Sequence, residues 1–321
     1  MVVRYLQLGD SRVSVIGLGT RKFGSRKWNY GSAYAQNMAR QILERAIELG
    51  VNLINTAETY GSGASEMIFG AALASRAQVF LATNFSPLSD RSAHIEKRCR
   101  EACKRFGVES IDLYQLNGLN PLVNLGEVGL CLENLSAQGL IRSVGSRNFS
   151  VAKWESFESS LSMPVFSNQI HYSLLVREPE LEQLPFALAR GRVIIASSPL
   201  EGGVLAARFD RRNVPKELRR LNRHSSVDAL ERMQPLLASL SKIAKAQEAS
   251  MAQIALAWTI SHPNVVVVPN ALTVSQLEAN VEAASLTLTA AEIADLNYAS
   301  ELYRASTGNR LLRSVRTRAG I

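Results

Sequence analysis

Short β-branched runs alternate with stretches of helical spacing along most of this chain, and this alternation limits the possible folds more than any other feature. Strands that are joined through helices pair in parallel, and eight such units close into a barrel. We therefore predict an α/β fold, a (β/α)8 TIM barrel in a single domain. The eight predicted strands are 15–18, 53–55, 79–83, 111–116, 141–145, 165–169, 193–197 and 265–269.

Helical spacing fills the segments between these strands. Gly50, Gly107, Gly139 and Gly191 each follow a helical stretch and precede a strand, where a left-handed residue ends a helix favourably. The N-terminal residues alternate like strands and predict a short β-hairpin that closes the barrel floor. The barrel then spans residues 1–321, with a basic tail from about 304 to 321. The predicted helices are 39–49, 65–74, 93–106, 130–138, 151–161, 180–189, 229–260, which is long enough for two helices, and 275–284.

An open, doubly wound sheet is the main alternative to the barrel. Its first strand leads into a G-x-G-x-x-G turn that opens a helix. The first turn of this chain reads Gly17-Leu18-Gly19-Thr20 and lacks the third glycine. The barrel is therefore the better prediction.

Composition indicates an ordinary globular protein. Apolar residues make up 46% and charged residues 20% of the chain, which suffices for a large core and excludes a disordered chain. The net charge is +8, but no basic segment is interleaved with aromatic residues, so we expect no nucleic-acid partner. The three cysteines lack metal-ligand spacing, and the N-terminus has no apolar run of a signal peptide or membrane span. We expect a cytoplasmic protein without a metal site or membrane partner, and the oligomeric state is left open.

Neutral amides dominate the positions at which the predicted strands end. Chemistry in this fold lies at the carboxyl ends of the strands. Amides donate and accept hydrogen bonds but do not exchange protons near neutral pH, so they can orient a polar ligand without acid–base work. The nearest titratable or charged candidates are Tyr60, Arg21, Arg147 and Glu201. The strand-end residues are Asn55, Asn84, Asn117, Asn148, Gln169, Ser197 and Asn270.

Several segments carry a resemblance to one family. Aldo-keto reductases hold a catalytic Asp and Tyr, a Lys and a His in three segments, which resemble GVNLINTAETYGSGASEMIFGAAL, LATNFSP and IDLYQLNGLNP here. Their nicotinamide, pyrophosphate and adenine segments are similar, in this order, to VGSRNFS, SNQIHYSLL, IIASSPLEGGVL and VVVVPNALTVSQLEANVEAA. The resemblance runs from about Tyr5 to Tyr303, and the opening GLGTRKFGSRKWNYG resembles an actinobacterial branch. The chain is identified as a member of the aldo-keto reductase superfamily.

The resemblance implies NADPH-dependent carbonyl reduction, in which a Tyr donates a proton, a Lys paired with an Asp lowers the Tyr pKa, and a His orients the substrate. Only Tyr60 keeps its identity, because Asn55, Asn84 and Asn117 replace the Asp, Lys and His. A cation ~4 Å away contributes roughly 4 kcal/mol at an effective dielectric constant of 20. Without it, Tyr60 is expected to be a poor proton donor. Replacing both Asp and Lys avoids the unpaired buried charge that losing either alone would leave.

The same resemblance implies a cofactor cleft that is half retained, with NADP(H) as the candidate cofactor. Ser197 stands where an aromatic ring usually stacks on the nicotinamide, and Arg147 stands where a small Ser is usual. Glu201 brings a carboxylate into the pyrophosphate turn. The matching positions are Asn148 and Gln169 for the carboxamide, Ser198 and Leu200 for the pyrophosphate, and Gln276 and Asn280 for the adenine.

Each candidate site residue also has a structural interpretation besides its role in catalysis or binding. Tyr60 can fill a pocket wall, and the three Asn residues can satisfy strand-end backbone. Arg21 and Arg147 form either a solvated rim or an anion site. Glu201 is expected as an exposed loop carboxylate rather than as a new acid–base group. The remaining expectations are Glu58 and Glu66 in structural roles, His171 and Trp28 as packing or rim residues, and 208–224 as a lid.

Three functions remain open on these grounds. The leading hypothesis is a repurposed aldo-keto reductase fold that binds a small, polar, anionic metabolite and performs redox-neutral chemistry such as isomerisation, dehydration or cyclisation, with carbonyl reduction weak or lost. The second is an NADP(H)-dependent reductase with atypical acid catalysis on an activated carbonyl. The third is a non-catalytic binding or regulatory subunit.

Overall fold

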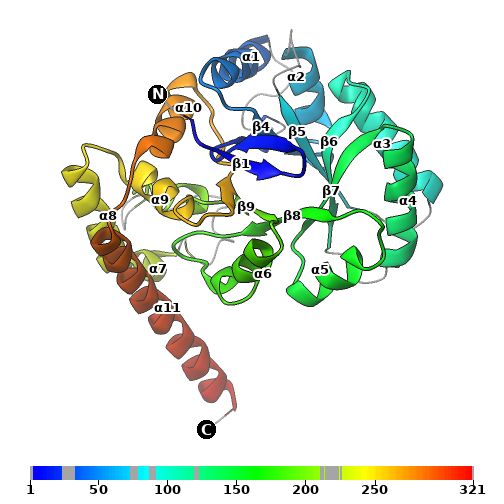
Figure 1. Ribbon diagram of the computed structural model, residues 1–321. Coiled ribbons are helices and arrows are strands. Elements are labelled where there is room, and N and C mark those ends of the chain that lie inside the picture. The colour runs from blue at the N-terminus through cyan, green and yellow to red at the C-terminus, as the bar shows by residue number, and fades with distance from the viewer. Residues whose placement is uncertain are drawn as a thin grey trace.

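Parallel strands form the centre of the protein, and helices surround them (Figure 1). The computed structural model describes residues 3–23, 33–72, 79–86, 92–118, 123–209, 213, 224 and 226–319. The eight-stranded sheet follows the order of the chain from β3 to β10, which confirms the predicted barrel order. Its strands are β3 (Leu18–Gly19), β4 (Leu53–Ala57), β5 (Phe80–Phe85), β6 (Ile111–Asn117), β7 (Ile141–Arg147), β8 (Val165–His171), β9 (Val193–Ser197) and β10 (Val265–Val267).

The sheet closes where its last strand returns to its first. Parallel bridges join Ile16 to Val267 and Gly19 to Asn270. Glycine is required at this seam, because a Cβ on Gly19 would lie 2.6 Å from the carbonyl oxygen of Val268. The same holds at Gly17, whose Cβ would lie 2.6 Å from a carbonyl oxygen of β4. The first turn is therefore a close-packed barrel seam and not a dinucleotide-binding turn.

A hairpin of β1 (Tyr5–Leu8) and β2 (Ser11–Ser14) precedes the barrel, as predicted. Leu8 and Val13 belong to one buried cluster with the inward-facing Leu53, Leu113 and Val266. The hairpin therefore covers the amino-terminal end of the barrel interior and leaves the carboxyl end as the mouth.

Helices follow the strands and cover the outside of the barrel (Figure 1). Among the described residues no helix is both long and apolar enough to cross a membrane. The cysteines Cys99, Cys103 and Cys131 are buried in the layer between helices and sheet. The helices are α1 (Ala33–Glu48), α2 (Ala64–Ala72), α3 (Ser92–Phe106), α4 (Leu125–Ala137), α5 (Val151–Glu158), α6 (Gln183–Ala189), α7 (Val227–Arg232), α8 (Gln234–Ala246), α9 (Met251–Thr259), α10 (Val274–Glu282) and α11 (Ala290–Ala319), with short 3-10 turns η2 (Glu178–Glu180), η3 (Glu201–Gly203) and η5 (Ala283–Ser285).

Two helical expectations differ from the structure. The segment 229–260 contains parts of three helices instead of two, because Pro235 in the first turn of α8 cannot continue the preceding helix. The tail from about 304 continues α11 as a helix to Ala319, which the sequence analysis did not anticipate. The lid predicted at 208–224 lies almost entirely outside the described residues, as does Trp28.

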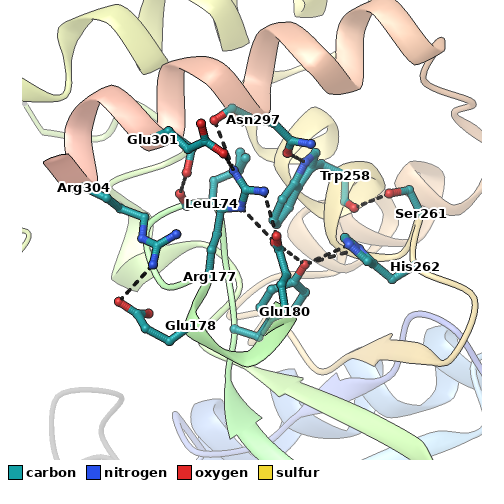
Figure 2. Close-up of polar contacts among 12 residues, drawn as sticks. Leu174, Arg177, Glu178, Glu180, Trp258, Ser261, His262, Asn297, Glu301 and Arg304 are labelled. Atoms are coloured by element: carbon teal, nitrogen blue, oxygen red, sulfur yellow. Dashed lines mark hydrogen bonds and ion pairs between the residues drawn. The ribbon is translucent and has the colours of Figure 1, made fainter. Parts of the chain in front are cut away.

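A polar network fastens α9 and α11 to the loop that follows β8 (Figure 2). Arg177, only 7% exposed, makes a two-pronged bond to Glu180 at 2.8 and 2.7 Å and donates to the carbonyl oxygen of Asn297 at 3.1 Å. Tyr172 donates its hydroxyl to Glu180 at 2.9 Å, and the Trp258 indole donates to the Asn297 side chain at 2.9 Å. Because this loop starts one residue after β8, the network also fixes the end of that strand.

Burial alone would raise the pKa of Glu180, but the bond and charge of Arg177 together with the Tyr172 hydroxyl outweigh it and lower that pKa. A carboxyl group whose folded-state pKa is lowered stabilises the fold above its unfolded pKa, and this contribution is lost as the pH falls through the folded value. Glu180→Gln should therefore lower the free energy of unfolding by about 2 kcal/mol at neutral pH. Urea unfolding measures this difference, which should shrink in acid.

Glu178→Gln is the matched control for this substitution. Glu178 is 56% exposed at its side chain and lies 3.6 Å from Arg304, so its loss should cost under about 0.5 kcal/mol. Equal effects of the two substitutions would contradict the assignment of the buried ion pair as the fastening element.

Candidate active site

Side chains from neighbouring strands meet in rows at the mouth of the barrel. The register places Asn117 beside Arg147, Arg147 beside Gln169, and His171 beside Ser197. Successive side chains of a strand point to opposite faces, so Gln169 and His171 lie on the same face of β8. The predicted strand-end residues therefore come together, although they are far apart in the sequence.

Amide groups bond to one another at the bottom of the mouth. Asn84, 2% exposed, donates its side-chain NH2 to the carbonyl oxygen of Thr56 at 2.9 Å and to Gln169 Oε1 at 2.8 Å. Asn55, also 2% exposed, accepts a bond from Gln115 Nε2 at 3.2 Å. Asn55 and Asn84 thus have different partners. A neutral amide network fills the place that the family resemblance gives to an ion pair.

Gln115 is a site residue that the sequence analysis missed. It stands two residues before Asn117 on β6 and is fully buried. The period-2 pattern of the strand places both side chains on the inner face, so this signal was present in the sequence. Gln115 lies one layer below the strand ends, to which the prediction of site residues was limited.

Three polar atoms of this region are buried without a hydrogen-bond partner among the described residues. They are Asn84 Oδ1, Gln115 Oε1 and Arg147 Nε. Buried polar groups are normally paired, and each exception needs an explanation. Two acceptors and one donor concentrated at the mouth are suited to a ligand that carries both donors and acceptors.

Asn117 and Tyr60 lie higher in the mouth. Asn117 donates to Ser86 Oγ at 3.0 Å and accepts from Asn148 Nδ2 at 3.3 Å. Tyr60 is half-buried in the loop after β4, and its hydroxyl has no bonded partner in the described part of the chain. No described cation is bonded to this hydroxyl.

Strained backbone marks the loops after β7 and β9. Asn148 and Ser198 have φ values of 58° and 57°, in the left-handed region that residues with a Cβ rarely adopt. Such residues cluster at ligand sites, where the surrounding structure holds them. Both positions match the carboxamide and pyrophosphate segments of the sequence resemblance.

Glu201 differs from its predicted environment. The expectation of an exposed loop carboxylate is wrong, because the side chain is 0% exposed. Glu201 Oε1 lies 2.5 Å from His171 Nε2 and accepts a bond from Ser173 Oγ at 2.6 Å. His171 itself is 44% exposed at its side chain and stands at the rim. The loop after β8 thus supplies the partners that draw this carboxylate inward.

The environment of Glu201 controls its ionisation. Burial alone would raise the pKa of Glu201, but the hydrogen bond and charge of His171, the Ser173 hydroxyl and the charge of His224 outweigh it and lower that pKa. Glu201 is therefore a stable carboxylate near neutral pH. A group in this state accepts bonds well and donates no proton.

The other carboxylates near the mouth hold structure together. Glu66 in the first turn of α2 pairs with Arg105 at 2.6 Å and accepts from Thr83 at 2.8 Å. Glu58 pairs with Arg98 and accepts from the Ser86 backbone N–H at 2.9 Å. These contacts agree with the structural roles expected of both.

The remaining predicted residues lie at the edge of the mouth. Arg21 is exposed at the end of the segment after β3. Gln276 accepts a bond from the Leu272 backbone N–H at 3.0 Å, and Asn280 is 8% exposed on α10. Leu200 is half-buried before η3. Their proposed contacts to an adenine, a pyrophosphate or an anion stay predictions.

Comparison with known proteins agrees with this geometry. The profile described as the aldo/keto reductase family matches residues 15–301. The chain belongs to the aldo/keto reductase family. This confirms the resemblance, and the fold expected of an aldo/keto reductase is the barrel described above.

Individual aldo/keto reductases and their relatives match over nearly the whole chain. An uncharacterised oxidoreductase of Mycobacterium tuberculosis is 41% identical over 317 residues, which cover 98% of each chain. The methylglyoxal reductase of Escherichia coli is 30% identical over 310 residues, covering 96% of this chain and 97% of that one. Among solved structures, the glycerol dehydrogenase of Gluconobacter oxydans superposes with a TM-score of 0.86 at 26% identity, covering 93% and 95%. A Klebsiella pneumoniae aldo-keto reductase in complex with NADPH gives 0.77 at 25% identity, with the same coverage.

The amide network predicts how this aldo/keto reductase responds to restored charges. Asn84→Lys alone places an unpaired ammonium at a buried position and should lower the free energy of unfolding by about 3–5 kcal/mol. Adding Asn55→Asp supplies a counter-charge from the neighbouring strand and should recover more than half of that loss. Thermal and urea unfolding of both variants measure this. A double variant as unstable as the single one would contradict the expectation that a carboxylate at position 55 can pair with an ammonium at position 84.

Proposed function

We propose that this protein is an NADP(H)-dependent oxidoreductase that reduces an activated carbonyl group in a small, polar, anionic compound. The observation that carries the proposal is a contrast, at the mouth of the barrel, between the residues at cofactor positions and those at proton-transfer positions. Among the residues that match cofactor positions, Gln169 is buried and Asn148 and Ser198 lie exposed in strained backbone, whereas the positions that the resemblance assigns to proton transfer hold neutral amides. Relatives described as oxidoreductases and reductases favour this function over the redox-neutral hypothesis. The cytoplasmic location expected from the sequence is part of the same proposal.

The residues of the mouth fit a nicotinamide cofactor. A carboxamide both donates and accepts, and Asn84 Oδ1 and Arg147 Nε are buried without partners at the positions next to Gln169. Glu201 has a φ of 50° in the turn after β9, and its backbone N–H donates to the Ser198 carbonyl oxygen at 3.0 Å, which closes this turn. When bound, NADPH supplies the two electrons of the reduction as a hydride. Asn148 and Gln169 would hold its carboxamide, and 198–203 its pyrophosphate.

Arg147 and Arg21 suggest an anionic substrate. Arg147 stands on β7 between Asn117 and Gln169, and its Nε carries a donor that no described residue accepts. Guanidinium groups bind carboxylates and phosphates through paired, charge-assisted hydrogen bonds. Arg21 is exposed and follows β3, the strand that meets β10 where the barrel closes. A carboxylate or phosphate on the substrate would bind at Arg147 first.

The missing cation limits which carbonyl can react. In the described part of the chain no cation is bonded to the Tyr60 hydroxyl, so no neighbouring positive charge assists proton transfer from it. A carbonyl made electrophilic by a neighbouring carbonyl or carboxylate needs less help from an acid. The relative described as methylglyoxal reductase is named for a compound whose aldehyde has a neighbouring carbonyl group. We therefore expect turnover with α-dicarbonyl and α-keto acid substrates and little with simple aldehydes.

Calorimetric titration with NADPH and NADP+ tests the cofactor assignment. Binding in the micromolar range or tighter, about −8 kcal/mol or better, is expected. Gln169→Leu, which removes the amide between Asn84 and Arg147, should weaken binding about tenfold or more. Glu66→Gln, outside the mouth, serves as a control for nonspecific loss of stability. Absence of binding to the wild-type protein at millimolar cofactor would refute the function.

Restoring the charged residues tests the account of proton transfer. The combined substitution Asn55→Asp, Asn84→Lys and Asn117→His should raise the turnover of simple aldehydes at least about a hundredfold, the range of general acid catalysis. Tyr60→Phe should abolish this gain in the triple variant. In the wild-type background the same Tyr60→Phe should change the turnover of activated substrates only a fewfold. An unchanged rate in the triple variant would show that these positions do not limit the reaction.

Redox-neutral chemistry is the second candidate, because a ring of neutral amides can bind an anion without any bound hydride donor. Binding of NADP(H) with no consumption of NADPH on any activated carbonyl would favour it. A protein that neither binds cofactor nor turns over substrate would instead fit the binding-subunit hypothesis.

A further inference from the structure

Both backbone groups of Ser86, the residue that follows β5, are held by one ion pair. Glu58 in the loop after β4 accepts from the Ser86 backbone N–H at 2.9 Å, and Arg98 of α3 donates to the Ser86 carbonyl oxygen at 2.7 Å. Glu58 and Arg98 are also paired with each other, and their side chains are only 15% and 19% exposed. The pair therefore fixes the backbone of Ser86 from two sides.

This fixation places the Ser86 side chain at the mouth. Successive residues of a strand point to opposite faces. Phe85 stacks on Tyr114 in the layer between sheet and helices, so Ser86 continues the inner face on which Asn84 lies. Ser86 Oγ accepts from Asn117 Nδ2 at 3.0 Å. The hydroxyl hydrogen of Ser86 meets no acceptor among the described residues, so it can be donated to a ligand.

Asn117 is oriented by its own two contacts. Its Oδ1 accepts from Asn148 Nδ2 at 3.3 Å, and its Nδ2 donates to Ser86. These bonds define which side of the amide is the oxygen and which is the nitrogen. A side-chain amide nitrogen carries two hydrogens, so the second hydrogen of Asn117 Nδ2 is a further donor at the mouth.

Arg147 supplies a third donor beside these two. The register pairs it with Asn117 on the neighbouring strand. Gly145, two positions earlier on β7, packs against the buried Gln115, so Arg147 stands on the same inner face. Its Nε is buried and bonds to none of the described residues. Because neighbouring strands lie about 4.8 Å apart, the donors of Ser86, Asn117 and Arg147 follow one another along one arc of the mouth.

The charge of this arc indicates the class of its ligand. A carboxylate offers two acceptor oxygens and one negative charge, which the single guanidinium of Arg147 balances. A phosphate monoester carries about −1.5 to −2 charges near neutral pH. The ion pair of Glu58 and Arg98 adds no net charge that could compensate for this excess. The three donors therefore fit a carboxylate better than a phosphate.

We propose that the Ser86 hydroxyl, the Asn117 amide and the Arg147 guanidinium form a carboxylate subsite, which selects 2-oxo acids among the activated carbonyl compounds. Ser86 is a binding residue, and Glu58 and Arg98 are its positioning residues. In the reduction, the carbonyl carbon takes the hydride of NADPH, which becomes NADP+, and the carbonyl oxygen takes one proton, while the carboxylate stays unchanged. The subsite rests on the proposed function and names the substrate class of that site.

Two substrates that differ only in the carboxylate test the subsite. 2-Oxopropanoate and its methyl ester contain the same activated ketone, but the ester carries no charge. NADPH consumption gives kcat and KM for both substrates. Ser86→Ala should lower the ratio of kcat/KM for the acid to kcat/KM for the ester about tenfold or more, chiefly through the KM of the acid, because a hydrogen bond to a charged group is lost. Arg147→Gln should lower the same ratio further.

Glu58→Gln separates positioning from binding. It keeps the shape of the side chain but weakens the hold on the Ser86 backbone, so the acid-to-ester ratio should fall a fewfold. In the Ser86→Ala background the same substitution should cause no further fall, because residues that act through one group are not additive. A general loss of stability would lower the turnover of both substrates alike. Ser110→Ala, the same substitution just before β6 at the opposite end of the barrel, should keep the wild-type ratio.

Thermal unfolding of each variant shows whether it is folded at the assay temperature. Ser86→Ala, which removes one oxygen from a half-buried side chain, is the variant on which the conclusion depends. An unchanged acid-to-ester ratio in Ser86→Ala, or wild-type turnover of the ester without turnover of the acid, would overturn the subsite and leave the proposed function intact. Lack of NADPH binding, or bound NADPH that neither substrate consumes, would overturn the proposed function and the subsite with it.

Discussion

Closure of the sheet between β3 and β10 is the constraint on which the site depends. Gly19 allows the backbones at the seam to approach closely, Gly17 does the same against β4, and every strand end then faces one mouth. Asn84 and Gln169, separated by 85 positions in the chain, meet at 2.8 Å only because the barrel is closed with this register. A shift of one residue on β8 would turn Gln169 outward and break the contact.

Charged and neutral groups have different places around this mouth. The buried carboxylates Glu66 and Glu201 and the half-buried Glu180 each have a cationic or histidine partner within 2.7 Å. Among the described residues, three of the five buried side-chain atoms without partners belong instead to the mouth, at Asn84, Gln115 and Arg147. Because unpaired buried polar groups destabilise a fold, the unused hydrogen-bonding capacity is concentrated where a ligand can satisfy it. The outer ion pairs stabilise the frame, and the inner amides remain available for binding.

The sequence predicted the strands and most of the helices well, but it predicted contacts between residues far apart in the chain poorly. Strand β9 has the predicted bounds, because its β-branched run lies between Gly191 and a polar turn. Helix α11 was missed because its basic second half has weak apolar periodicity. The burial of Glu201 depends on His171 and Ser173, which lie 30 and 28 positions earlier in the chain. Local patterns carry no information on such contacts, so a carboxylate in a Gly-rich turn was expected to be exposed.

Glu201 also combines two unfavourable features that a glycine would avoid. Its φ of 50° costs about 1–2 kcal/mol for a residue with a Cβ, and its carboxylate is removed from water. The bonds from His171 and Ser173 offset the second cost without lowering the first. Backbone strain persists where the surrounding structure enforces it, and it concentrates at ligand sites. A charged, strained and fully bonded residue in the turn after β9 therefore indicates a function at the mouth, because the fold itself does not require such a residue there.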